Sequence, residues 1–143
     1  YAQKLTATMN IIKAYVDRLK DAGAYDNASI VIMADHGLVD VDDESAYVMK
    51  RFNPIFYVKG VGEQHSAMLR SDKPISYADL NDAFDQLRLG ARSTELFADI
   101  ENPRTRMLVY YYWTNKDHMV EYTTDGKAWD DSKMVPTGRV FDR

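Results

Sequence analysis

The chain has 143 residues, 45% of them hydrophobic, which suits one globular core and is too short for two comfortable domains. Its formal charge of −4 comes from mixed signs spread along the sequence, and the absence of a basic block argues against a nucleic-acid partner. The absence of cysteine excludes disulfides and thiolate metal sites.

The first elements predicted along the chain are a helix and a strand. Apolar residues recur at steps of four and three from Leu5 to Leu19, which predicts an amphipathic helix that stops near Gly23. The run Ile30–Ala34 is apolar at every position, so we expect an inner strand of a parallel sheet, covered on both faces. No stretch has the length of a signal peptide or membrane span, so we expect an excised piece whose parent would carry any anchor upstream.

A second strand and a second helix follow. Asn53 and Pro54 introduce the apolar run Ile55–Val58, which predicts a short strand closed by a turn at Gly60. Further on, a capping-box-like start, an apolar stripe and a terminal glycine predict a helix, and the residues concerned are Ser76, Asp79, Leu80, Phe84, Leu87 and Gly90.

The carboxyl-terminal part predicts a small antiparallel meander. Met107–Trp113 is dense in β-forming residues, Thr114–Asp117 resembles a turn, and His118–Thr123 should pair back. Asp125 and Gly126 mark another turn, and Gly138–Phe141 can add a last strand. We therefore divide the chain into an α/β part, residues 1–92, and a connector with the meander, residues 93–143.

Asp35 and His36 are the residues that point to chemistry. They stand directly after the apolar strand, and ligands of open α/β sheets bind beyond the carboxyl ends of the strands. A carboxylate and an imidazole can hold a divalent cation together, and Gly37 lets the backbone turn away. The alternative from spacing alone is that Asp35 caps a turn and His36 packs.

A longer pattern resembles a known family. The stretch from Tyr25-Asp26-Asn27 through Ile30–Ala34 to Asp35-His36-Gly37 resembles the sulfatase-like part of the alkaline phosphatase superfamily. The likeness continues through residues 53–60 and 74–80 up to Gly90, about the first two-thirds of the chain. The resemblance implies a partial alkaline-phosphatase-like α/β/α sandwich, followed here by the small antiparallel sheet.

The resemblance also implies an activity. It implies a hydrolase or transferase of phosphate or sulfate esters, in which Asp35 and His36 match the late pair of metal ligands. The nucleophile and the early acidic ligand match nothing in this sequence, so we expect no catalytic residue in the chain and no activity from it alone. The parent would be a bacterial extracytoplasmic enzyme, and membrane anchoring stays open.

The imidazole bears on the choice of metal. It favours zinc or manganese over calcium or magnesium, which prefer oxygen ligands but are left open. This choice favours phosphoester over sulfate ester chemistry. Two ligands without their partners should bind the metal only weakly.

Other polar residues have weaker claims. His65 lies in a polar loop from which it could contact an anionic substrate, although a surface histidine is the safer interpretation. The acidic run Asp40, Asp42, Asp43 and Glu44 lacks the spacing of a calcium loop and suits a solvated loop. His118 has no ligand partner nearby and receives no role.

Two other functions remain open. A non-catalytic module could bind glycans or a protein through the tyrosine-rich strand Tyr110–Trp113, although core packing also uses such rings. Alternatively, the chain could only complete the sheet of an upstream domain, in which case an exposed sheet edge would favour self-association.

Overall fold

The computed structural model describes residues 2–37, 53–112, 115–127 and 130–142. In these residues it has mixed helices and strands, with two small antiparallel sheets, which agrees with a general α/β class. The elements are α1 (Ala2–Asp21), β1 (Ile30–Met33), β2 (Phe56–Lys59), the 3-10 helix η1 (Tyr77–Asp79), α3 (Leu80–Arg88), β3 (Arg106–Tyr112), β4 (Asn115–Thr124), the 3-10 helix η2 (Asp131–Lys133) and β5 (Val135–Asp142).

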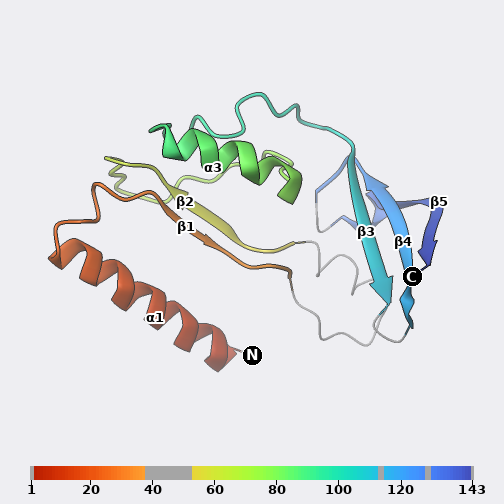
Figure 1. Cartoon of the computed structure of the whole chain (residues 1–143), viewed down its shortest axis with the longest axis horizontal. Helices are drawn as coiled ribbons and strands as arrows, with labels where there is room; N and C mark the ends of the chain where they lie inside the picture. Colours follow the sequence, from red (N-terminus) through yellow and green to blue (C-terminus); the bar gives the residue numbers. More distant parts are fainter. Residues whose placement is uncertain (1, 38–52, 113–114, 128–129, 143) are drawn as a thin grey trace.

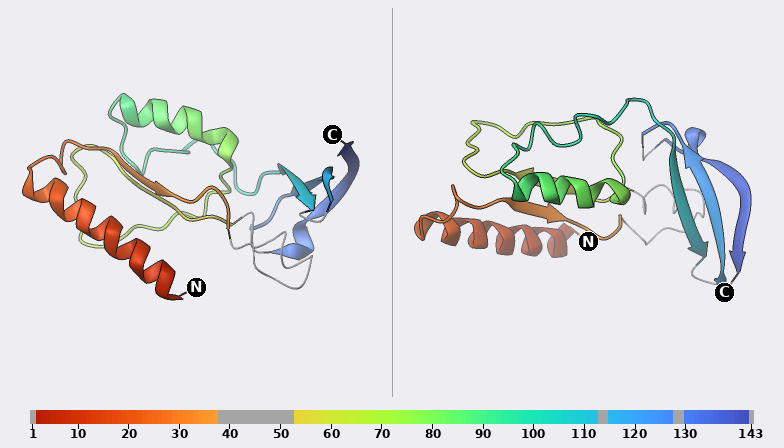
Figure 2. Two further views of the ribbon diagram at one scale, coloured as in Figure 1. Left: turned by 60° about the horizontal axis from the view of Figure 1, so that its bottom comes forward. Right: turned by 45° about the horizontal axis from the view of Figure 1, so that its top comes forward.

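Strands β1 and β2 form a two-stranded ribbon between the two helices (Figures 1 and 2). The strands run antiparallel, with Ile30 opposite Lys59 and Met33 opposite Phe56. The expectation of an inner parallel strand is therefore wrong for the described residues. The residues of β1 are only partly buried or exposed, and an unbroken apolar run carries no information on the direction of the neighbouring strand.

The buried core lies between α3 and one face of the ribbon. Ala83, Leu87 and Leu96 form its buried cluster, against which Val31 and Val58 pack. Leu80 is also buried, whereas Phe84, expected in the stripe, is 40% exposed. Leu80, Ala83 and Leu87 are spaced by three and four residues, so the core face follows Ala83 and leaves Phe84 at its margin.

Glycines end both helices, as their positions predict. Gly23 follows α1 with a φ of 67°, and Gly90 follows α3 with a φ of 93°. These left-handed conformations are accessible to glycine without steric cost and stop the helical hydrogen bonding. Within the described residues, neither helix is long and apolar enough to cross a membrane.

The second sheet has the order β3-β4-β5 and lies beyond the end of β1 (Figure 1). The predicted meander is confirmed, and β4 and β5 are longer than expected. Asn115, Lys116 and Asp117 belong to β4 and not to a turn, because cross-strand pairing extends back to Asn115, which is opposite Tyr112. Arg106, the first residue of β3, donates to the carbonyls of Ile75 and Gly126 and so links this sheet to the loop before η1.

Candidate functional site

Asp35 and His36 follow the end of β1 and both line a cleft of about 770 Å³, at its rim. One wall of the cleft comes from the loop at residues 70–78, and the other comes from β3 and the turn at Gly126 and Lys127. The Asp35 side chain is 89% exposed and that of His36 is 39% exposed, so both can be reached by a solute.

The local hydrogen bonds leave one nitrogen of His36 available. Its Nδ1 lies 2.7 Å from the carbonyl oxygen of Gly37. Because a carbonyl can only accept, Nδ1 is the donor in this contact, and in the neutral imidazole the lone pair is then on Nε2. The His36 backbone N–H donates to Asp35 Oδ1 at 3.0 Å, which leaves Asp35 Oδ2 as the outward oxygen.

The two remaining donor atoms fit a single cation. His36 Nε2 lies 3.7 Å from Asp35 Oδ2. Two atoms bound to one zinc ion at about 2.1 Å each can lie at most about 4.2 Å apart, so this separation is compatible with a shared ion. Among the residues that the structure describes, no group of three or more histidine, aspartate or glutamate side chains is placed to hold a metal. The described donor set is thus a pair.

Tyr77, which the sequence did not single out, stands beside this pair. Its hydroxyl donates to the carbonyl oxygen of Ala34 at 2.5 Å, and its side chain lines the same cleft. Burial raises the pKa of Tyr77, and the negative charge of Asp35 raises it further. The hydroxyl therefore stays protonated and able to donate at neutral pH. Sequence spacing gives no signal for this contact, because 43 positions separate the two residues.

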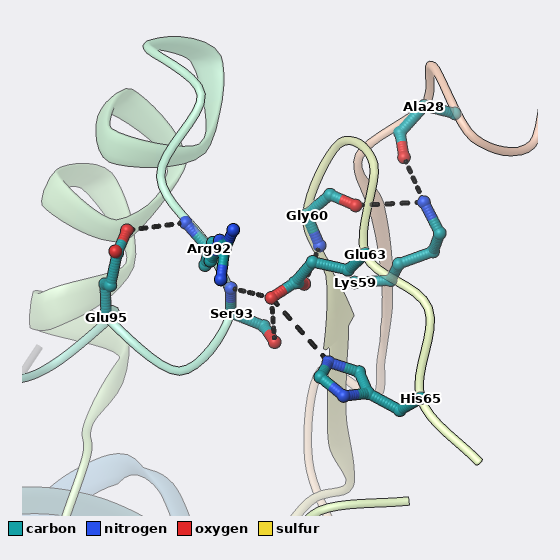
Figure 3. A network of polar contacts seen from close by, with 8 residues as sticks. All are labelled: Ala28, Lys59, Gly60, Glu63, His65, Arg92, Ser93 and Glu95. Carbon is teal, nitrogen blue, oxygen red and sulfur yellow. Dashed lines mark hydrogen bonds and ion pairs between the residues drawn. The ribbon is translucent and has the colours of Figure 1, made fainter. Parts of the chain in front are cut away.

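His65 is not brought to this cleft. It follows β2 at the Ile30 end of the ribbon, whereas Asp35 and His36 follow the Met33 end of β1. Its Nε2 lies 3.8 Å from the buried carboxylate of Glu63 (Figure 3). His65 also lines a separate, smaller pocket with Arg92 and Thr94. A role of His65 toward substrate stays a prediction.

The structure does not describe the side chains of several candidate residues. Asp40, Asp42, Asp43, Glu44 and Trp113 lie outside the described residues, and for Tyr110, Tyr111, Tyr112 and His118 only the backbone is described. A glycan-binding or protein-binding role of the tyrosine-rich strand accordingly stays a prediction.

The chain matches no family model, no curated protein and no solved structure. The resemblance to the alkaline phosphatase superfamily therefore stays a prediction from the sequence.

Proposed function

We propose that this chain is the carboxyl-terminal part of a sulfatase-like hydrolase or transferase of the alkaline phosphatase superfamily, acting on phosphate or sulfate esters. In this proposal residues 1–92 belong to an alkaline-phosphatase-like α/β/α sandwich, and Asp35 and His36 hold a divalent cation. The observation that supports it most is the 3.7 Å separation of His36 Nε2 and Asp35 Oδ2 at the rim of the cleft.

The charge of the cleft favours an anionic ligand. The described residues that line it include four cationic side chains, Arg70, Lys73, Arg106 and Lys127, and two carboxylates, Asp35 and Asp72. The difference, four minus two, is an excess of two positive charges in a chain whose formal charge is −4. Local positive charge in a recessed surface attracts anionic substrates against a negative overall charge. Phosphate and sulfate esters satisfy this requirement.

The ligand atoms favour zinc or manganese. Imidazole nitrogen together with one carboxylate oxygen suits these ions better than calcium or magnesium. When bound, such an ion would polarise the ester oxygen as a Lewis acid. His36 would bind through Nε2 while Gly37 holds its Nδ1–H, and Asp35 would bind through the outward Oδ2. The nucleophile would come from a part of the parent enzyme that this sequence does not match.

Zinc titration of the 143-residue chain, followed by NMR, tests the proposal. We expect the backbone amide signals of Asp35 and His36 and the imidazole signals of His36 to shift. The dissociation constant should be in the micromolar range or weaker, because the described donors are only two. His36→Gln and Asp35→Asn should each remove the shifts. His65→Gln is the matched control and should leave them in place.

One result would overturn the proposed metal site, and another would overturn the expectation that the site is incomplete. Zinc-dependent shifts that persist in both His36→Gln and Asp35→Asn would show that the pair is not the site. The second is activity: we expect no turnover of chromogenic phosphate or sulfate esters with added zinc or manganese. Turnover by the 143-residue chain that disappears in His36→Ala would contradict an incomplete site.

A further inference from the structure

Ala34, the residue just before Asp35, has both of its backbone polar groups hydrogen-bonded. The backbone N–H of Ala34 donates to the carbonyl oxygen of Ile55 at 3.2 Å, and the carbonyl of Ala34 accepts from the Tyr77 hydroxyl at 2.5 Å. The carbonyl belongs to the planar peptide that joins Ala34 to Asp35, so its orientation fixes where the next residue begins. Asp35 thus leaves β1 from a peptide whose rotation is restrained by Tyr77.

Tyr77 is itself held in place by the start of α3. It is the first residue of η1, whose N-cap is Ser76. The backbone N–H of Ser76 donates to Asp79 Oδ2 at 2.6 Å, and Arg104 forms an ion pair with the same oxygen. Arg104 Nε also donates to the carbonyl of Pro74 at 3.1 Å. Contacts therefore run from the segment before β3, through the turn that carries Tyr77, to the exit of β1.

We propose that Tyr77 is a positioning residue for the Asp35 and His36 pair: its hydroxyl holds the Ala34 carbonyl and so fixes the direction in which both ligands face the cleft. This inference rests on the proposed metal site. Residues that orient metal ligands through hydrogen bonds typically change metal affinity when they are removed. Tyr77 as a whole residue is 48% exposed, so its packing contributes little to the core. Its role is therefore separable from stability.

The substitution Tyr77→Phe removes only the hydroxyl, in the 143-residue chain. We expect zinc affinity to fall about tenfold, the lower end of what loss of an orienting partner costs, with little change in the unfolding midpoint. In the metal-free chain, the signals of Ala34, Asp35 and His36 should shift or broaden. Tyr57→Phe is the matched control. Tyr57 precedes Val58 in β2, and neighbouring residues of a strand face opposite sides, so Tyr57 lies on the face of the ribbon opposite to Val58 and the core.

A double-mutant cycle tests the contacts that hold Tyr77. Asp79→Asn weakens the pair with Arg104, and we expect it to lower zinc affinity in the wild-type background. The effect of Asp79→Asn should largely vanish in the Tyr77→Phe background, because the hydrogen bond from the Tyr77 hydroxyl to the Ala34 carbonyl is then already absent. An equal effect in both backgrounds would refute the claim that Asp79 influences zinc affinity through Tyr77.

The failure of the two proposals can be told apart. If Tyr77→Phe matches Tyr57→Phe in zinc affinity and in the metal-free signals, while His36→Gln still abolishes binding, the role of Tyr77 is refuted and the metal site stands. If zinc binding is unchanged in both His36→Gln and Asp35→Asn, the proposed function fails, and the metal-directed role of Tyr77 fails with it. The metal-free spectrum of Tyr77→Phe would still show whether the hydroxyl orders this corner.

Discussion

Glu63 accepts two hydrogen bonds from Ser93, from its backbone N–H at 2.9 Å and from its hydroxyl at 3.0 Å (Figure 3). Its other carboxylate oxygen accepts from the Gly60 backbone N–H at 2.5 Å. The Glu63 side chain is only 5% exposed. This carboxylate therefore ties the turn after β2 to the segment after α3, at the end of the ribbon remote from Asp35 and His36.

The first prediction concerns this carboxylate. Glu63→Gln keeps the shape of the side chain but replaces one acceptor oxygen with a donor that faces another donor. Leaving buried N–H groups without an acceptor costs about 1 to 3 kcal/mol, and we expect the free energy of unfolding to fall by that amount. Chemical denaturation measures it. Glu101→Gln, at an exposed position, is the control; equal stability of the two variants would refute the role assigned to Glu63.

The second prediction is the pH dependence of stability. Burial alone would raise the pKa of Glu63, but the hydrogen bonds from Gly60 and Ser93 outweigh it and hold the pKa below its usual value. The pKa of Asp79 is lowered in the same way, against burial, by Arg104 and Ser76. The stabilisation from a lowered acid pKa is present above the unfolded value, about 4, and is lost as pH falls through the folded value.

Stability should therefore be flat near neutral pH and should decline below about pH 4 to 5. The double variant Glu63→Gln and Asp79→Asn should lose part of this decline, because both groups no longer titrate. Unfolding midpoints measured from pH 3 to pH 7 check it. A double variant with the same slope as the wild type would show that other carboxylates dominate acid unfolding.

The elements of the fold could be predicted because they depend on local patterns. The apolar spacing of α1 and the glycines Gly23 and Gly90 each specify a local conformation, and the structure has these features where they were expected. The direction of β2 relative to β1 could not be predicted, because an apolar run is compatible with either pairing.

The candidate site could be predicted only in part. Asp35 and His36 are adjacent in sequence and follow an apolar strand, so their common position needed no knowledge of distant contacts. Tyr77 and Glu63 act on residues far away along the chain, and nothing in their neighbours indicates those partners. His65 shows the converse. It follows β2, and because β2 runs antiparallel to β1, the end of β2 lies beside Ile30, away from Asp35 and His36.

The third prediction concerns Gly60, which lies close to the backbone of Ala91 in the segment after α3. A Cβ atom at this position would lie 2.8 Å from the carbonyl oxygen of Ala91 and 3.0 Å from Glu63 Oε2. Gly60→Ala must displace the segment after α3 or the Glu63 carboxylate, and overpacking of this kind costs about 1 to 3 kcal/mol. We expect a lower unfolding midpoint, measured by circular dichroism. Val61→Ala, at the exposed neighbour, is the control, and a midpoint equal to the control would contradict the close contact.

The fourth prediction concerns self-association. In the described residues, β1 and β2 each pair on one side only, and unpaired strand edges recruit further strands. On α1, the apolar stripe is incompletely covered, with Leu5 62% and Met9 43% exposed. Exposed apolar surface of this kind favours association between protein molecules.

We expect the chain to form dimers or larger species at high micromolar concentration, and sedimentation velocity measures this. Leu5→Lys combined with Met9→Lys should weaken the association, because charge on the stripe opposes its burial. Asn10→Lys is the matched control, since position 10 projects from the other side of the helix. If Leu5→Lys with Met9→Lys associates as strongly as the control while the strand amides at 30–33 gain hydrogen-exchange protection with concentration, the sheet edge is the contact. A wild-type chain that remains monomeric would refute both surfaces.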